Sequence, residues 1–318
     1  MKNIGFDTPY FTDKNQARKY LEGIRWPNGV VCPHCGSDEK HYPIKGKEDS
    51  KNPVREGVWK CKKCRKQFSV TVGTVFEDSH IPLNKWLLAT FLICSSKKGM
   101  SSHQLHRMLK VTYKTALFMS HRIRYAMDDK KVKLSGIVEV DETYVGGKEK
   151  NKHFDKKLNT GRGGVGKTPV FALVERHGNV ISMPVQRVTG ANLKAIIRQN
   201  VEKSATVMTD NFLSYRGLGK DFSSHQVVNH GKREYVKGNA HTNTIEGYFS
   251  ILKRGITGVY HHVGEQHLHR YLSEFNFRYN GRKINDDERS TLALRGIEGK
   301  RLMYRDSSEK EMATVRGI

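Results

Sequence analysis

Apolar residues recur with helical spacing through much of the first 130 positions. A short amphipathic helix is predicted over 12–26, and it ends at the turn signal Pro27-Asn28-Gly29. A longer helical stretch covers 83–127 and is broken at Lys98-Gly99 and at Val111-Thr112. Because Ser101 and Gln104 are spaced as an N-terminal capping box, the second of its three helices is expected to begin there.

Beyond the polar run 128–133, the pattern changes to one that is typical of strands. His177-Gly178-Asn179 is a hairpin signal between two of them. The predicted strands cover 137–145, 170–175, 180–186, 205–210 and 225–229, and the predicted helices cover 191–201, 244–254 and 264–279. Three strands followed by helix, strand, strand and helix is the order of a ribonuclease-H-like α/β fold, which is a mixed sheet with flanking helices.

These changes of pattern divide the chain into four segments. Residues 1–80 hold the first helix and a cysteine-rich module, and residues 81–133 form a helical region with the character of a helix-turn-helix. Residues 134–285 form the ribonuclease-H-like domain, and residues 286–318 are expected to be a charged C-terminal extension. A chain of 318 residues is long enough for several domains, each with a core of its own.

Lysine and arginine total 56 against 32 acidic residues, which gives a net charge of +24. This excess selects a polyanionic partner, because each neutralised phosphate releases a condensed counterion. Nucleic acid is the expected partner, and an anionic membrane surface is the alternative. No stretch has the length of a membrane span, and residues 1–10 lack the apolar core of a secretory signal. We therefore expect a cytoplasmic, nucleoid-associated protein without a membrane partner.

Four of the five cysteines form two Cys-x-x-Cys pairs, Cys32 with Cys35 and Cys61 with Cys64. Each pair can present two thiolates to one cation, and two pairs complete the tetrahedral shell that structural zinc prefers. The twenty-five residues between the pairs exceed the usual spacing of a zinc ribbon, so extra hairpin or turn residues are expected there. A redox pair or simple burial is the alternative to one structural zinc ion. Cys94 lies on an apolar helical face and is expected to pack in the core.

Three acidic residues are placed where the predicted fold would gather them. Asp141 lies in the first strand, Asp210 ends the fourth, and Glu246 opens a helix. The first and fourth strands are neighbours in this fold, so the two aspartates meet and the helix brings the glutamate alongside. Carboxylate oxygens suit Mg²⁺ or Mn²⁺. Two such ions about 4 Å apart can activate an attacking hydroxyl and hold the leaving oxygen of a phosphodiester.

The pattern alone leaves competitors for these positions. Glu139 and Glu142 compete with Asp141, and Asp221 competes with Asp210. Acids at the ends of strands are commonly just exposed surface residues, so both interpretations stay open on the residues alone.

A glycine-rich segment over 161–168, GRGGVGKT, matches the nucleotide-binding P-loop pattern. A P-loop must follow a strand and open a helix, whereas Pro169 and a β-rich run follow here. Residues 148–168 carry seven basic and two acidic side chains. We interpret the segment as a flexible loop that contacts the DNA backbone through Arg162 and Lys167, and we expect no nucleotide cofactor.

Further basic and polar residues are candidates for DNA contact. The last helix of the helical region could enter a major groove, or the region could be a linker that only packs its apolar residues. The candidates are Lys114, Arg122 and Arg124 in this helix, and Asn243, Lys253, Arg254 and His261 around the third acid.

Three strings carry a family resemblance, VEVDETYVGG, VMTDNFLSYRGL and HTNTIEGYFSILKRGITGVYHH. With the cysteine pairs in front of them, they resemble the bacterial insertion-sequence transposases that combine a zinc ribbon with a DDE domain, in the family numbered fifteen ninety-five. The resemblance covers about residues 20–304. It implies that Asp141, Asp210 and Glu246 are the catalytic triad, that the fold is ribonuclease-H-like, and that DNA is cut and joined at the ends of an element.

We therefore expect a DNA transposase that transfers phosphodiesters with two Mg²⁺ or Mn²⁺ ions, the zinc ion serving structure. Its partners would be double-stranded DNA at element ends and target. A homodimer or higher oligomer is expected, because two ends must be held together. The alternatives are a ribonuclease-H-like nuclease or resolvase that cuts without joining, and a zinc-ribbon DNA-binding regulator with a degenerate catalytic domain.

Overall fold

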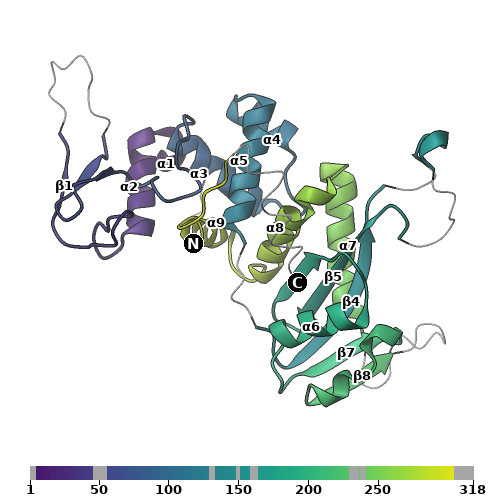
Figure 1. Ribbon diagram of the computed structural model, residues 1–318. Helices are drawn as coiled ribbons and strands as arrows, with labels where there is room; N and C mark the ends of the chain where they lie inside the picture. The colour runs from purple at the N-terminus through teal and green to yellow at the C-terminus, as the bar shows by residue number, and fades with distance from the viewer. Residues whose placement is uncertain are drawn as a thin grey trace. The chain divides into compact units, whose positions relative to one another are not determined.

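The computed structural model (Figure 1) describes residues 5–45, 56–128, 133–147, 151–157, 164–228, 236 and 241–303. Compactness divides the chain into two units. Unit 1 takes residues 1–127 and 284–307, and unit 2 takes residues 128–283 with 308–318. Among the described helices, none has the length and apolar content that crossing a bilayer requires.

Unit 1 combines helices with a small antiparallel sheet. The strands β1 (His41–Pro43), β2 (Trp59–Cys61) and β3 (Gln67–Phe68) follow one another in the order β1-β2-β3. The helices are α1 (Pro9–Thr12), α2 (Lys14–Arg25), α3 (Leu83–Ser95), α4 (Ser102–Leu109), α5 (Tyr113–Ala126) and α9 (Asp286–Arg295). Side-chain caps fix where several helices begin: Asp13 accepts from the backbone of α2, Ser101 from α4 and Thr112 from α5.

Helix α9 corrects the expectation of a charged extension after residue 285. Asn285 and Glu288 form a capping box that starts the helix. Arg289 then donates to the carbonyl of Cys94, 3.0 Å away at the end of α3. On the same helix, Ala293 and Leu294 are buried. The chain thus returns to unit 1 after completing unit 2, so residues 286–303 belong to a folded core rather than to a solvated tail.

Unit 2 is built on a five-stranded mixed sheet in the order β6-β5-β4-β7-β8. Its strands are β4 (Ile137–Val145), β5 (Thr168–Glu175), β6 (Val180–Pro184), β7 (Thr206–Asp210) and β8 (Ser224–Val228). β4 is antiparallel to β5 and parallel to β7, and β7 is parallel to β8. This is the ribonuclease-H-like topology that the order of elements predicted, with β4 as the central strand.

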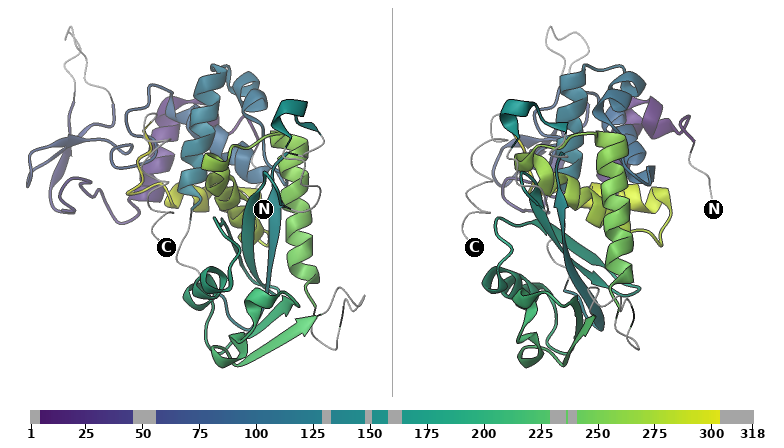
Figure 2. Two further views of the ribbon diagram at one scale, coloured as in Figure 1. Left: turned by 45° about the vertical axis from the view of Figure 1, so that its right-hand side comes forward. Right: turned by 90° about the vertical axis from the view of Figure 1, so that its right-hand side faces the viewer.

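Helices cover both faces of this sheet. α6 (Gly190–Asn200) lies on one face, and α7 (Asn243–Gly255) and α8 (Leu268–Asn280) lie on the other. In Figure 2, α7 is the light green helix that runs alongside the central strands. Short helical turns complete the unit at Phe154–Lys156, Leu213–Tyr215, Leu218–Lys220, Ile256–Tyr260 (a π-helix) and Glu265–His267.

The alternation of side chains along β4 decides which residues meet α7. Val138 and Val140 pack with Leu193 and Ile197 of α6. The intervening positions point to the opposite face, where Val145 packs with the buried stripe of α7. Asp141 therefore points to the α7 side of the sheet.

Candidate active site and metal centre

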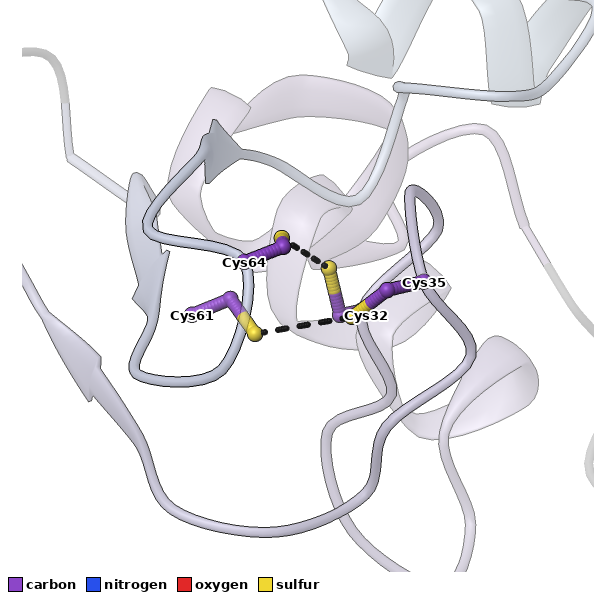
Figure 3. A group of neighbouring side chains, drawn as sticks. All are labelled: Cys32, Cys35, Cys61 and Cys64. Carbon is purple, nitrogen blue, oxygen red and sulfur yellow. Dashed lines mark hydrogen bonds between the residues drawn. The ribbon is translucent and has the colours of Figure 1, made fainter.

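The four paired cysteines of unit 1 converge on one point (Figure 3). Their sulfur atoms all lie within 4.8 Å of one another. Cys32 and Cys64 are 3.7 Å apart at sulfur, as are Cys35 and Cys61. A tetrahedron with metal–sulfur bonds of about 2.3 Å has edges of about 3.8 Å, so the cluster has the dimensions of a zinc site. The four predicted zinc ligands fit the ion.

Local backbone bonds shape both knuckles. The Cys32 N–H donates to the Ser37 carbonyl, and the Cys61 N–H donates to the Lys66 carbonyl. Hydrogen bonding by the Cys64 backbone lowers the pKa of the Cys61 thiol to about 6, whereas burial raises the pKa of Cys32. Zinc binding requires all four thiolates, so the ion must displace the protons from the more basic sulfurs. Cys94 is buried on α3, apart from this cluster.

Removing zinc is expected to unfold the ribbon. Cys61→Ser deletes one ligand, and the two short strand pairings of β1-β2-β3 are too small to hold without the ion. We expect one zinc per chain in the wild type, and in Cys61→Ser a loss of zinc together with protease cleavage between residues 30 and 70. Elemental analysis and limited proteolysis measure both. Cys94→Ala is the matched control and should keep its zinc; a ribbon that resists protease without metal would contradict the assignment.

In unit 2, Asp141 and Asp210 stand at the same level on adjacent parallel strands. Ile137 pairs with Thr206 and Glu139 with Met208. Asp210 lies as far beyond Met208 as Asp141 lies beyond Glu139, and alternation points both aspartates to the α7 face. Each aspartate accepts one backbone N–H: Asp141 from Glu142 at 2.8 Å, and Asp210 from Phe212 at 3.1 Å.

Glu246 lies in the first turn of α7 and is exposed. Thr242 donates a hydrogen bond of 3.3 Å to its carboxylate. The buried stripe of the same helix packs Ile245, Phe249 and Leu252 against the sheet. The sheet and the helix together bring the three predicted acids to one side of unit 2.

Glu139 anchors α7 to the central strand. Its side chain is fully buried and accepts from the backbone N–H groups of Thr244 and Ile245, at 2.8 and 3.0 Å. It also pairs with Arg176 at 2.6 Å, and the His241 ring nitrogen Nδ1 lies 3.2 Å away. A carboxylate at a helix N-terminus satisfies donors that lack an intrahelical partner. Since its oxygens are engaged in this way, Glu139 serves as the cap that ties the first turn of α7 to strand β4.

The other competing acids also have partners of their own. Glu142 points to the α6 face and accepts a hydrogen bond from the Tyr215 hydroxyl. Asp221 pairs with Arg198 at 2.8 Å. Neither the anchoring role of Glu139 nor the Glu142–Tyr215 pair was expected from the sequence. The alternation along β4 was the available signal, because it separates Glu139 and Asp141 from Glu142.

The electrostatics of Asp141 fit a cation site. Burial, together with the nearby charges of Glu142, Asp210 and Glu246, raises the pKa of this carboxyl to about 7 against a backbone hydrogen bond that lowers it. Crowded carboxylates of this kind are stabilised by bound cations. Within the described residues, only the cysteine cluster has its ligand atoms inside 4.8 Å, so the three acids are more widely spread.

Two of the predicted DNA contacts are wrong. Arg122 and Arg124 of α5 are buried, with 6% and 0% of their surface exposed. Arg122 donates to the carbonyls of Leu302 and Glu77, and Arg124 donates to the Ser120 hydroxyl. Both guanidinium groups tie unit 1 together, so they are not available to a phosphate.

The remaining candidates are differently placed. Exposed side chains are found at Lys114, Asn243, Lys253, Arg254 and His261, and Lys167 is half-buried. On α7, the exposed positions Glu246, Ser250 and Lys253 follow one another at helical spacing. Arg162 and the first glycines of the P-loop-like segment lie outside the described residues. At its other end that segment leads directly into strand β5, which begins at Thr168, and not into a helix.

Comparisons with known proteins agree with this architecture. Residues 133–280 match the family model described as an ISXO2-like transposase domain, and residues 12–67 match that of a transposase zinc-ribbon domain. A relative from Halobacterium salinarum, described as an uncharacterized protein in transposable element ISH50, is 33% identical over 285 residues, which cover 84% of this chain and 91% of the relative.

Solved structures give a weaker match. A Mos1 transposase paired-end complex with its left transposon end matches at 15% identity and a TM-score of 0.27, over 63% of this chain and 70% of that one. The simian T-cell lymphotropic virus intasome in complex with a PP2A regulatory subunit matches at 14% identity and a TM-score of 0.27, over 61% and 65%. Superpositions this loose say nothing about the site.

Proposed function

Because this chain belongs to the ISXO2-like transposase family, with a transposase zinc ribbon ahead of its catalytic domain, we propose that Asp141, Asp210 and Glu246 are its catalytic carboxylates. The chain is a DNA transposase, an enzyme that transfers phosphodiesters with the help of divalent metal. One observation carries the assignment of residues. The two aspartates stand level on adjacent parallel strands, on the face where α7 carries the glutamate.

The three carboxylates would hold two divalent cations, Mg²⁺ or Mn²⁺, whose preference for oxygen ligands they match. When bound, these ions supply Lewis acidity at the attacking and leaving oxygens of a phosphodiester. The chain's own residues orient the site. Glu139 fixes the start of α7, and the backbone N–H groups of Glu142 and Phe212 fix the two aspartates. Lys253 and Arg254, further along the exposed side of α7, would hold the DNA backbone.

A strand-transfer assay tests this function. Labelled DNA carrying the element ends is incubated with the protein and Mg²⁺, and the products are separated by size. Joined products are expected. Cutting without joining would instead identify a nuclease or resolvase, and binding without either would identify a regulator. The two ends must be held together, so we propose that the active form is at least a dimer on DNA; a monomer on a single end, seen by light scattering of an active complex, would exclude that.

Helices α4 and α5 are proposed to read DNA as a helix-turn-helix. Lys110 takes a left-handed conformation at φ 51° in the turn between them, and Leu105 and Leu109 are buried beneath. The exposed surface of these two helices carries His103, whose ring stacks on that of Tyr113 with the ring centres 4.2 Å apart, and Lys114. These features support a proposal in which DNA contacts lie at the start of α5, where a recognition helix meets base edges, and not at its buried second half.

Substituting Lys114 with alanine tests that surface. The loss of one phosphate or base contact is expected to weaken binding to element ends several-fold and to reduce the salt dependence by about one unit of slope. Fluorescence anisotropy at several salt concentrations gives both values. Lys98→Ala removes an equally exposed charge between α3 and α4 and should leave end binding nearly unchanged. If the two substitutions weaken DNA binding equally, the effect of Lys114 is one of general positive charge and not of a specific contact.

A further inference from the structure

A cavity of about 570 Å³ opens in unit 2 near the start of α7. Its lining consists of Ile137, Arg176, His177, His241, Thr244, Tyr279 and Arg282. These residues come from the start of β4, the β5–β6 hairpin, the start of α7 and the end of α8. The volume is in the range of sites that enclose a small organic molecule, and it is larger than a single phosphate needs.

One wall of this cavity presents Arg282, a cation that is held without an acidic partner among the described residues. Arg282 donates to the carbonyls of Gly178 and Tyr279, each at 2.8 Å, and Lys283 donates to the His177 carbonyl at 2.9 Å. In the described part of the chain, neither side chain forms an ion pair. Backbone carbonyls at the hairpin thus fix two positive charges that remain available to an anion.

The other arginine of the lining is already neutralised. Arg176 also lines the cavity, but its charge is balanced by the buried carboxylate of Glu139. Of the two arginines in the lining, Arg282 is therefore the one whose charge is not balanced by a carboxylate in the part of the chain that the structure describes. An anion entering the cavity would be drawn to it.

The same wall offers a flat surface. The Arg282 guanidinium lies 4.1 Å from the centre of the Tyr279 ring, and Tyr279 is half-buried. Ile137 adds an apolar side chain to the lining. Planar guanidinium and aromatic groups stack on nucleobases of any sequence, and cations beside them hold the backbone. A nucleotide is the ligand that uses the charge, the flat surface and the volume together.

The position of the cavity relates it to the DNA strand in the active site. Ile137 lies four residues before Asp141 on one strand, about 13 Å at the usual rise per residue. Thr244 lies two residues before Glu246 on α7. We propose that this cavity holds an unpaired nucleotide of the bound DNA, a few positions from the scissile phosphate, with its phosphate on Arg282. The proposal rests on the proposed function for its ligand.

The test compares two DNA duplexes that carry the same element end. One is blunt and the other has a single-stranded tail of one to four nucleotides, and both are titrated by anisotropy without added divalent cation. Wild-type protein is expected to bind the tailed DNA about tenfold more tightly, the value of one stacked base. Arg282→Gln should remove that preference and keep the affinity for blunt DNA within about twofold. Arg187→Ala, which removes an exposed charge outside the cavity, should keep the preference.

Each other outcome overturns the proposal. Equal affinity of the wild type for both duplexes, or the same change in Arg282→Gln and Arg187→Ala, means that the cavity holds no nucleotide of the strand. If a free deoxynucleotide displaces the tailed DNA when the two are at similar concentrations, the cavity is instead a site for free nucleotides. Thermal unfolding confirms that the variants are folded. A chain that bound neither duplex would contradict the proposed function itself, and that result is distinct from a missing preference.

Discussion

Asp141→Asn is expected to lower DNA cleavage and joining by about a thousandfold or more while DNA binding stays close to that of the wild type. The substitution keeps the size and the hydrogen bond from the Glu142 backbone but removes the charge that would hold a cation between β4 and α7. Metal ions contribute several kcal/mol of transition-state stabilisation, and each 1.36 kcal/mol is a factor of ten in rate. The strand-transfer assay and a parallel binding titration give the two values.

A matched control separates this effect from the effect of removing a negative charge elsewhere in the protein. Asp221→Asn removes a carboxylate that is paired with Arg198 outside the site, so it should leave the rate nearly unchanged. Asp210→Asn and Glu246→Gln should behave like Asp141→Asn. A variant of the three that retains the normal rate would remove its residue from the triad.

Glu139→Gln is expected to destabilise the protein by about 3–5 kcal/mol, the cost of leaving a buried partner charge uncompensated. The glutamine cannot balance Arg176, whose side chain is only 12% exposed. The backbone N–H groups of Thr244 and Ile245 share one oxygen of Glu139, which the glutamine can retain, but the amide NH₂ that replaces the other oxygen cannot accept from Arg176. Urea unfolding of the full chain, followed by far-UV circular dichroism, measures the loss of stability.

The comparison for this prediction is Glu265→Gln, which changes an exposed acid in a short helical turn and should alter stability by less than about 0.5 kcal/mol. If Glu139→Gln unfolds like the wild type but no longer cleaves DNA, Glu139 would be a metal ligand and not the anchor of α7. That result would also require a different trio of acids.

The strands and helices of unit 2 follow from local pattern. β4 has the bounds that the sequence predicted, Ile137–Val145, because alternation and β-branched residues agree along it. The zinc site could be predicted because the spacing within each cysteine pair lets two sulfur atoms reach one ion. Asp141, Asp210 and Glu246 could be chosen as candidates because each stands at a strand or helix position that the topology makes adjacent.

What the sequence could not predict depends on contacts between distant segments. Arg122 and Arg124 are basic residues near the end of a predicted helix, where solvent exposure is the usual expectation, yet Arg122 reaches the carbonyl of Leu302, 180 positions later. Helix α9 is short and polar, and its partners α2, α3 and α5 lie far away in the chain. The role of Glu139 is of the same kind, since a helix that begins at Asn243 supplies the donors.

The direct test of the central claim is to locate the ions. Crystals of the protein bound to element-end DNA and soaked with Mn²⁺ would show the metal by its anomalous scattering. The account predicts two peaks about 4 Å apart, bounded by the carboxylates of Asp141, Asp210 and Glu246. Metal peaks at other acids, or DNA bound in the site with no ion between these three, would contradict it.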